Sequence, residues 1–189
     1  MTILIIGLFL FGGSHLFSVL LAPVRNRLSA WLGEARYKGI YSLVSAIGLG
    51  MMFWGYALTR GNSEMLYTPL ANAKHATMLL VLVGFIFIAA SSGKSYLKLW
   101  LQNPFSVGVC LWSIGHLIAN GKTPVVLIYL TLLVVASMDI VKCMARGNRP
   151  MFEPNVKSDV TAVVAGLAIY ALALFVFHPY VLGVKIAGN

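Results

Sequence analysis

The chain has 189 residues, of which 59% are hydrophobic and only 10% are charged. An average soluble domain is about 25% charged, so this composition excludes a water-soluble globular protein and indicates a lipid bilayer as its surroundings. The net charge of +9 would suit nucleic acid, but no platform of basic and aromatic residues accompanies it, and we expect no nucleic-acid partner.

Six stretches of the chain lack charged side chains and approach the length of about 20 apolar residues that a membrane helix needs. Backbone groups in lipid must pair within the segment, and runs without alternation exclude a β-barrel. The sequence therefore predicts an all-α, polytopic membrane protein with one domain over residues 1–189. Its six transmembrane helices are expected at about 3–24, 39–59, 75–93, 103–120, 123–142 and 160–184.

The segments around these stretches carry further signals, taken here in chain order. Met1–Val24 has neither a basic leading segment nor a small-residue cleavage site, so we expect a membrane helix and not a signal peptide. Arg25–Lys38 has apolar residues at helical spacing among charged ones, which predicts a short helix in the cytoplasmic interface. Lys94–Gln102 places aromatic residues at headgroup depth. Met144–Lys157, with one glycine and two prolines, is expected to be an irregular loop.

The basic residues predict the orientation. With the N-terminus outside, the inner segments hold ten lysines and arginines and the outer segments hold four. This positive-inside bias predicts that both termini face the periplasm or its equivalent.

A short repeated pattern suggests two inverted halves of three helices each. A His-Leu pair is followed eight residues later by Pro-Val in both halves, starting at His15 and at His116. Because each half would contain an odd number of helices, the repeat would be related by an axis in the membrane plane. Such an axis would place His15 and His116 on either side of one central ligand.

Histidines are the informative polar residues, because polar side chains inside a membrane are costly. His15, His116 and His178 lie inside apolar stretches, and His75 lies at the outer mouth of the third. Hydrogen bonding to a neighbouring helix is the simplest interpretation. A proton relay would need carboxylates, and Asp139 is the one acid in the apolar stretches. Axial ligation of haem iron by neutral imidazole needs no counter-charge and suits a helical bundle, so we expect His15 and His116 to be haem ligands.

Small and aromatic residues near these histidines complete the expected cofactor-binding site. Gly12 and Gly108 precede the two histidines and would leave room for a flat macrocycle; close helix packing is the alternative. Trp112 lies one turn before His116 and is expected to pack on it. His178 is followed by a proline near the outer interface and is interpreted as a helix-end feature.

Two blocks of the sequence resemble the NnrU family. LGEARYKGIYSLVS at 32–45, followed by Trp-Gly-Tyr at 54–56, resembles the segment that enters the family's second helix. Residues 103–121 resemble its HP…G…W…HL..NG block, and His15 and Asp139 also fit. The resemblance covers about residues 10–145. It implies a bacterial inner-membrane protein linked with nitrogen-oxide respiration (nitrite and nitric oxide reduction in denitrification), with a redox or respiratory partner in the membrane.

The same superfamily includes zeta-carotene isomerase, which is similar in the first-helix histidine and in the HP…W…AH block, and which uses haem b with histidine ligands. Carried over by this resemblance, the haem b ligands fall on His15 and His116. One departure is Asn103, which stands where the family usually has histidine. Three functions stay open at this point: a haem-containing factor of nitrogen-oxide respiration, a haem-dependent polyene isomerase, and a small membrane transporter. Whether the protein is an enzyme is also open.

Overall fold

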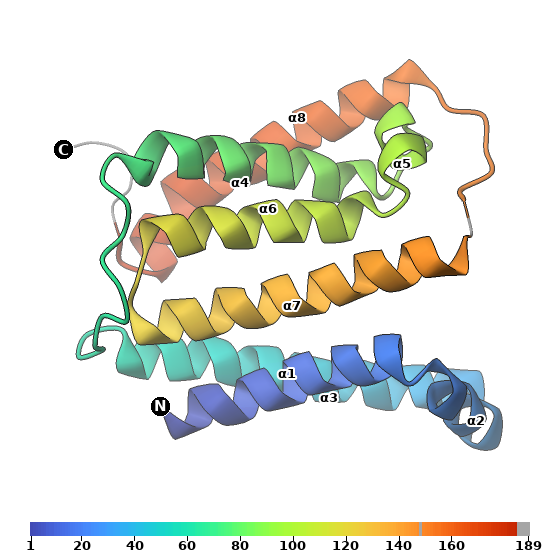
Figure 1. The fold of residues 1–189 in the computed structure, drawn as a ribbon, viewed down its shortest axis with the longest axis horizontal. Coiled ribbons are helices and arrows are strands. Elements are labelled where there is room, and N and C mark those ends of the chain that lie inside the picture. The colour runs from blue at the N-terminus through green and yellow to red at the C-terminus, as the bar shows by residue number, and fades with distance from the viewer. Residues whose placement is uncertain (148, 185–189) are drawn as a thin grey trace.

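The computed structural model describes residues 1–147 and 149–184, and its regular structure is helical (Figure 1). Within these residues the β-type pairing is limited to an isolated antiparallel bridge between Met65 and Lys122. The predicted all-α fold is confirmed. The helices are α1 (Thr2–Leu20), α2 (Ala22–Leu32), α3 (Glu34–Thr59), α4 (Ala73–Ala90), α5 (Tyr96–Leu101), α6 (Pro104–Ala119), α7 (Thr123–Arg146), α8 (Val156–Leu172) and the π-helix η1 (Ala173–Val181).

Five described helices are long and apolar enough to cross a membrane: α1, α3, α4, α7, and α8 together with η1. Their outer surfaces present large apolar side chains; Phe9, for example, is 78% exposed, which suits lipid. The sixth predicted span corresponds to α6, whose 16 residues reach about 24 Å, short of the roughly 30 Å hydrocarbon core. The chain is therefore a multi-pass membrane protein, with α6 as its shortest apolar helix.

The helices form an open ring. α1 packs against α3 and α7, α6 packs against α7 and α4, and α4 packs against α8. In Figure 1, α1 and α3 lie together on one side, α4, α6 and α8 lie on the other, and α7 runs between them. The ring closes near one end, where the Phe53 and Phe177 rings meet edge to face at 6.2 Å and Arg60 donates a hydrogen bond to the Leu182 carbonyl. We call this the outer end.

Glycines permit the closest helix contacts. A Cβ atom on Gly55 of α3 would lie 2.4 Å from the Leu4 backbone nitrogen of α1. One on Gly108 of α6 would lie 2.4 Å from the Gly84 carbonyl oxygen of α4. Association in lipid depends on packing of this kind, because lipid tails are as apolar as the helices.

The short helix predicted after the first span exists but is shorter than expected, and its place in the membrane interface stays a prediction. α1 ends at Leu20, and α2 begins at Ala22 with a proline in its first turn. α2 then ends before Gly33, whose φ of +82° breaks the helix. Glu34–Lys38 belongs to α3 instead, where the Lys38 ammonium lies 2.6 Å from the Glu34 carboxylate.

α7 and α8, like α3, extend past the predicted bounds, because residues on either side of the apolar stretches, charged ones included, continue the helices. α7 continues to Arg146 and α8 begins at Val156, so the predicted loop between them shortens. Lys94–Gln102 contains the six-residue α5, whose first amides donate to the Asp159 carboxylate of α8.

The helix contacts repeat only in part between the two suggested halves: α1 packs on α3 as α6 packs on α7. Exchange of the halves would pair α1 with α6, α3 with α7, and α4 with α8. α4 packs on α6, but its counterpart α8 makes no contact with α1 in the part of the chain described. α1 and α6 do not pack on each other either, because α7 lies between them. The packing therefore matches the suggested inverted repeat in part, and the repeat stays a prediction.

Candidate functional site

A cavity of about 1110 Å³ lies inside the helix ring. This exceeds the roughly 300–1,000 Å³ typical of small-molecule sites. Its walls come from α1, α3, α4, α6, α7 and η1, and most of the lining side chains are apolar. The lining side chains that carry chemistry include those of His15, Tyr41, Tyr56, Lys74, Trp112, His116, Tyr129, Asp139 and His178.

His15 projects from the second half of α1. Its Nδ1–H donates to the Phe11 carbonyl one turn earlier, at 2.8 Å. The imidazole also lies against the Phe11 and Tyr41 rings, with centroids 4.3 and 5.6 Å away. A carbonyl oxygen can only accept, so this bond places the proton on Nδ1 and leaves the lone pair on Nε2.

His116 repeats this arrangement in the last turn of α6. Its Nδ1–H donates to the Trp112 carbonyl at 2.9 Å, and Nε2 again keeps the lone pair. Tyr129 of α7 stacks on the imidazole, with centroids 4.2 Å apart and planes 15° apart. Trp112 meets it edge to face at 5.8 Å, as its position one turn earlier led us to expect.

His178 reaches the same cavity, which the sequence interpretation missed. It lies in η1, where its Nδ1–H donates to the Ala173 carbonyl at 2.6 Å, five residues back. The π-helix, a form frequent at functional sites, turns the imidazole inward. Its ring is nearly parallel to that of His116, with centroids 6.3 Å apart. The sequence does contain a signal for it, since His178 is a third histidine in an apolar stretch. The proline that follows it favoured a helix-end role instead.

The heights of His15 and His116 can be compared along α7. Gly12 is level with Thr131, since a Cβ on the glycine would lie 2.7 Å from the threonine methyl. His15 is three residues further and so level with about residue 134, whereas His116 stacks on Tyr129. The offset is about five residues, or roughly 8 Å along the axis. α1 and α6 run in opposite directions, and helical side chains lean toward their own N-terminus, so the two imidazoles lean toward each other.

The two glycines expected to make room beside the histidines lie at helix–helix contacts. Gly12 packs α1 against α7, and Gly108 packs α6 against α4. Neither lines the cavity. Close helix packing, the alternative interpretation, describes both positions.

Asn103 occupies the position where histidine was expected from the family motif. Its Oδ1 accepts from the Ser106 amide at 3.2 Å and caps the N-terminus of α6. Its Nδ2 donates to the Asp139 carboxylate at 2.7 Å, and the Ser106 hydroxyl donates to the same carboxylate oxygen, also at 2.7 Å. The carboxylate therefore lies at the N-terminus of a helix, where negative charge is favoured.

The remaining candidates lie outside this site. His75 is exposed on α4 and does not line the cavity. Across residues 1–147 and 149–184, no cluster of three or more His, Cys, Asp or Glu side chains is close enough to hold a metal ion. One or two imidazoles are enough for haem iron, so the donor set fits haem.

Comparison with known proteins gives one match. A family model described as NnrU protein matches residues 3–186, nearly the whole chain. No curated protein and no solved structure matches.

Proposed function

Because the chain belongs to the NnrU family, we propose that it is a haem b-binding protein of the bacterial inner membrane that supports nitrogen-oxide respiration. The observation that supports haem binding is a feature that two of the cavity histidines share. His15 and His116 both give their Nδ1 proton to their own helix, which leaves Nε2 as the donor atom of a ring that lines one large apolar cavity.

The surrounding residues prepare these imidazoles as ligands. A hydrogen bond at Nδ1 fixes the tautomer and the ring orientation, and it raises the basicity of the other nitrogen. Tyr129 and Trp112 restrict the rotation of the His116 ring, while Phe11 and Tyr41 do the same for His15. When bound, haem b supplies a redox-active iron that can carry one electron or bind nitric oxide.

His116 and His15 are the two residues that we propose would hold the haem, and His178 is the competing second ligand. The His116 and His178 rings lie nearly parallel, with centroids 6.3 Å apart, so these two side chains could also hold one group together. His116 is common to both pairs, so its loss should have the largest effect.

The role in nitrogen-oxide respiration rests on the family. The segments outside the spans are short: residues 60–72 join α3 to α4, and 147–155 join α7 to α8. They offer little surface for a soluble partner. We therefore expect a redox or respiratory partner that is itself in the membrane.

The test begins with absorption spectra of the purified protein, made with full haem supply, in its oxidised and reduced states. We expect a Soret band that shifts on reduction, loss of bound haem in His116→Ala, and a changed coordination spectrum in His15→Ala. His75→Ala is the matched control and should leave the spectrum unchanged, because that side chain is exposed outside the cavity.

Two results would revise the proposal. A colourless wild-type protein would contradict the proposal that haem is bound. A spectrum altered by His178→Ala but not by His15→Ala would keep the haem and make His178 the second ligand. In cells, deletion should slow nitrite or nitric oxide consumption under low oxygen, and His116→Ala should fail to restore it.

A second candidate is haem-dependent isomerisation of a polyene. The observation that favours it is a cavity of about 1110 Å³ with mostly apolar walls inside the spans, which an apolar chain could enter from lipid. Incubation of the reduced protein with a cis-carotenoid, followed by chromatography of the isomers, tests it. Conversion that depends on His116 would favour the isomerase over the respiratory role.

A further inference from the structure

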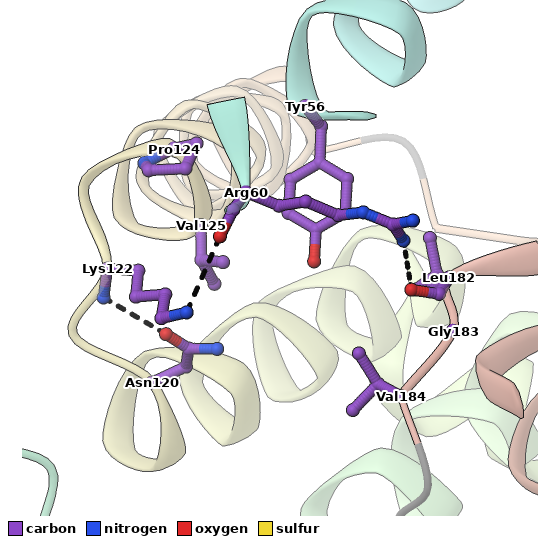
Figure 2. A pocket seen from close by; sticks show the side chains of 9 residues that line it. All are labelled: Tyr56, Arg60, Asn120, Lys122, Pro124, Val125, Leu182, Gly183 and Val184. Carbon is purple, nitrogen blue, oxygen red and sulfur yellow. Dashed lines mark hydrogen bonds between the residues drawn. The ribbon is translucent and has the colours of Figure 1, made fainter. Parts of the chain in front are cut away.

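A second, smaller pocket lies at the outer end of the helix ring and carries positive charge. Its volume is about 370 Å³. Arg60 at the end of α3 and Lys122 before α7 both line it, together with Tyr56 and Asn120 (Figure 2). Residues 182–184, which follow η1, form another wall.

Among residues 1–147 and 149–184, neither cation has an acidic partner. The ion pair found in the described part of the chain joins Lys38 to Glu34, near the opposite end. Arg60 instead donates to the Leu182 carbonyl, and the Lys122 ammonium donates to the Arg60 carbonyl at 3.4 Å. A guanidinium has five N–H groups and an ammonium has three, so both keep donors for a ligand. Arg60 is half-buried, which strengthens its attraction for an anion compared with a fully solvated cation.

The pocket adjoins the central cavity. Five residues line both spaces, and they come from α3, from the end of α6, from α7 and from the segment after η1: Tyr56, Asn120, Val125, Leu182 and Val184. Figure 2 shows Tyr56 beside the Arg60 side chain, with its hydroxyl pointing into the pocket. An apolar cavity that leads to a cationic mouth suits a ligand with an apolar body and an anionic end.

We propose that Arg60 and Lys122 bind the carboxylates of an amphipathic ligand whose apolar body lies in the central cavity. This rests on the proposed function, since a dicarboxylate porphyrin is such a ligand, and it assigns the orientation: the acid groups face the outer end. Arg60 binds a carboxylate through its planar fork, and Lys122 acts as a point charge. Tyr56 and Asn120 supply neutral hydrogen-bond donors beside them.

The test uses metal-free protoporphyrin, because it has the two carboxylates but no iron for histidine to bind. Binding to the full-length protein in detergent is measured by quenching of tryptophan fluorescence and compared with the dimethyl ester, which has the same ring without charge. We expect the diacid to bind about tenfold or more tightly than the ester. The double variant Arg60→Gln, Lys122→Gln should lose this preference while still binding the ester.

The matched control is Arg27→Gln, Arg36→Gln, which removes two exposed cations near the opposite end and should keep the preference. His15→Ala and His116→Ala should keep it too, even where iron ligation is lost, so this proposal and the haem proposal can fail separately. Equal binding of diacid and ester by the wild-type protein would overturn the assignment. A preference that disappears in vesicles containing phosphatidylglycerol would also overturn it, because the pocket would then be a site for lipid headgroups.

Discussion

Asn103, which stands where the family usually has histidine, determines the chemistry next to Asp139, at the end of the cavity opposite the outer end. Its amide donates to the Asp139 carboxylate, which lines the cavity, and its carbonyl oxygen caps α6. A histidine at this position could gain or lose a proton beside that carboxylate. An amide cannot, so in this chain the contact to Asp139 is a fixed donor and takes no part in proton transfer.

Replacing Asn103 should therefore affect stability more than chemistry. Asn103→Ala removes the cap of α6, worth about 1 kcal/mol, and one donor to a half-buried carboxylate, worth about 1–3 kcal/mol. Asn103→Ser keeps a capping hydroxyl and loses only the donor. Thermal unfolding in detergent should give the lowest midpoint for the alanine variant and an intermediate one for serine. If alanine and serine melt alike, the cap contributes nothing and this account of Asn103 is wrong.

At the scale of elements, close packing of α1 on α3 depends on glycines at chosen positions. Gly55 has the Leu4 backbone where a side chain would be, whereas a Cβ on Gly50, five residues earlier in the same helix, would meet nothing within 4 Å. The pair thus separates packing from helix propensity, since both substitutions add the same methyl group to the same helix.

Gly55→Ala should destabilise the protein by about 1–3 kcal/mol through overpacking. Gly50→Ala should be neutral or stabilising by up to about 1 kcal/mol, because alanine is the better helix former. Unfolding of both variants in the same detergent compares them directly. Equal stability of the two variants would contradict the close α1–α3 contact.

The helices themselves could be predicted because lipid leaves few alternatives. Charge-free stretches predicted the apolar helices, and the periodicity of apolar residues predicted the short helix after the first one. The break at Gly33 depends on one positive φ angle, and the bend at Leu21 depends on the turn before Pro23, neither of which hydropathy describes. The π-helix η1 lies inside the predicted span 160–184, but hydropathy does not distinguish a π-helix from an α-helix, and η1 is the element that carries His178 to the cavity.

At the scale of the whole molecule, neighbours in space were harder to predict than helices. His15 and His116 were singled out from their chemistry, and both line the central cavity. That α7 would lie between α1 and α6, and that α4 would pack on α6, depends on side-chain shape across distant segments. The charged outer pocket likewise joins residues from three distant parts of the chain, which no local pattern in the sequence connects.

The two ends of the molecule differ in charge, and this difference predicts its orientation. α2, α5 and the segment between α7 and α8 lie at one end in Figure 1, and the N-terminus and the α3–α4 segment lie at the other. Ten of the fourteen basic residues lie in the segments of the first end or in the helix ends and short connections that adjoin them. Basic segments are retained on the cytoplasmic side, so the pocket formed by Arg60 and Lys122 should open to the periplasm.

Cysteine labelling tests this orientation. In a background with Cys110→Ala and Cys143→Ala, Asn62→Cys places an exposed thiol in the α3–α4 segment and Ala30→Cys places one on α2. A membrane-impermeant maleimide added to spheroplasts should label Asn62→Cys at once and Ala30→Cys only after permeabilisation, while the background stays unlabelled. The opposite pattern would invert the protein in the membrane. The outer pocket would then open to the cytoplasm, and its ligand would have to arrive from that side.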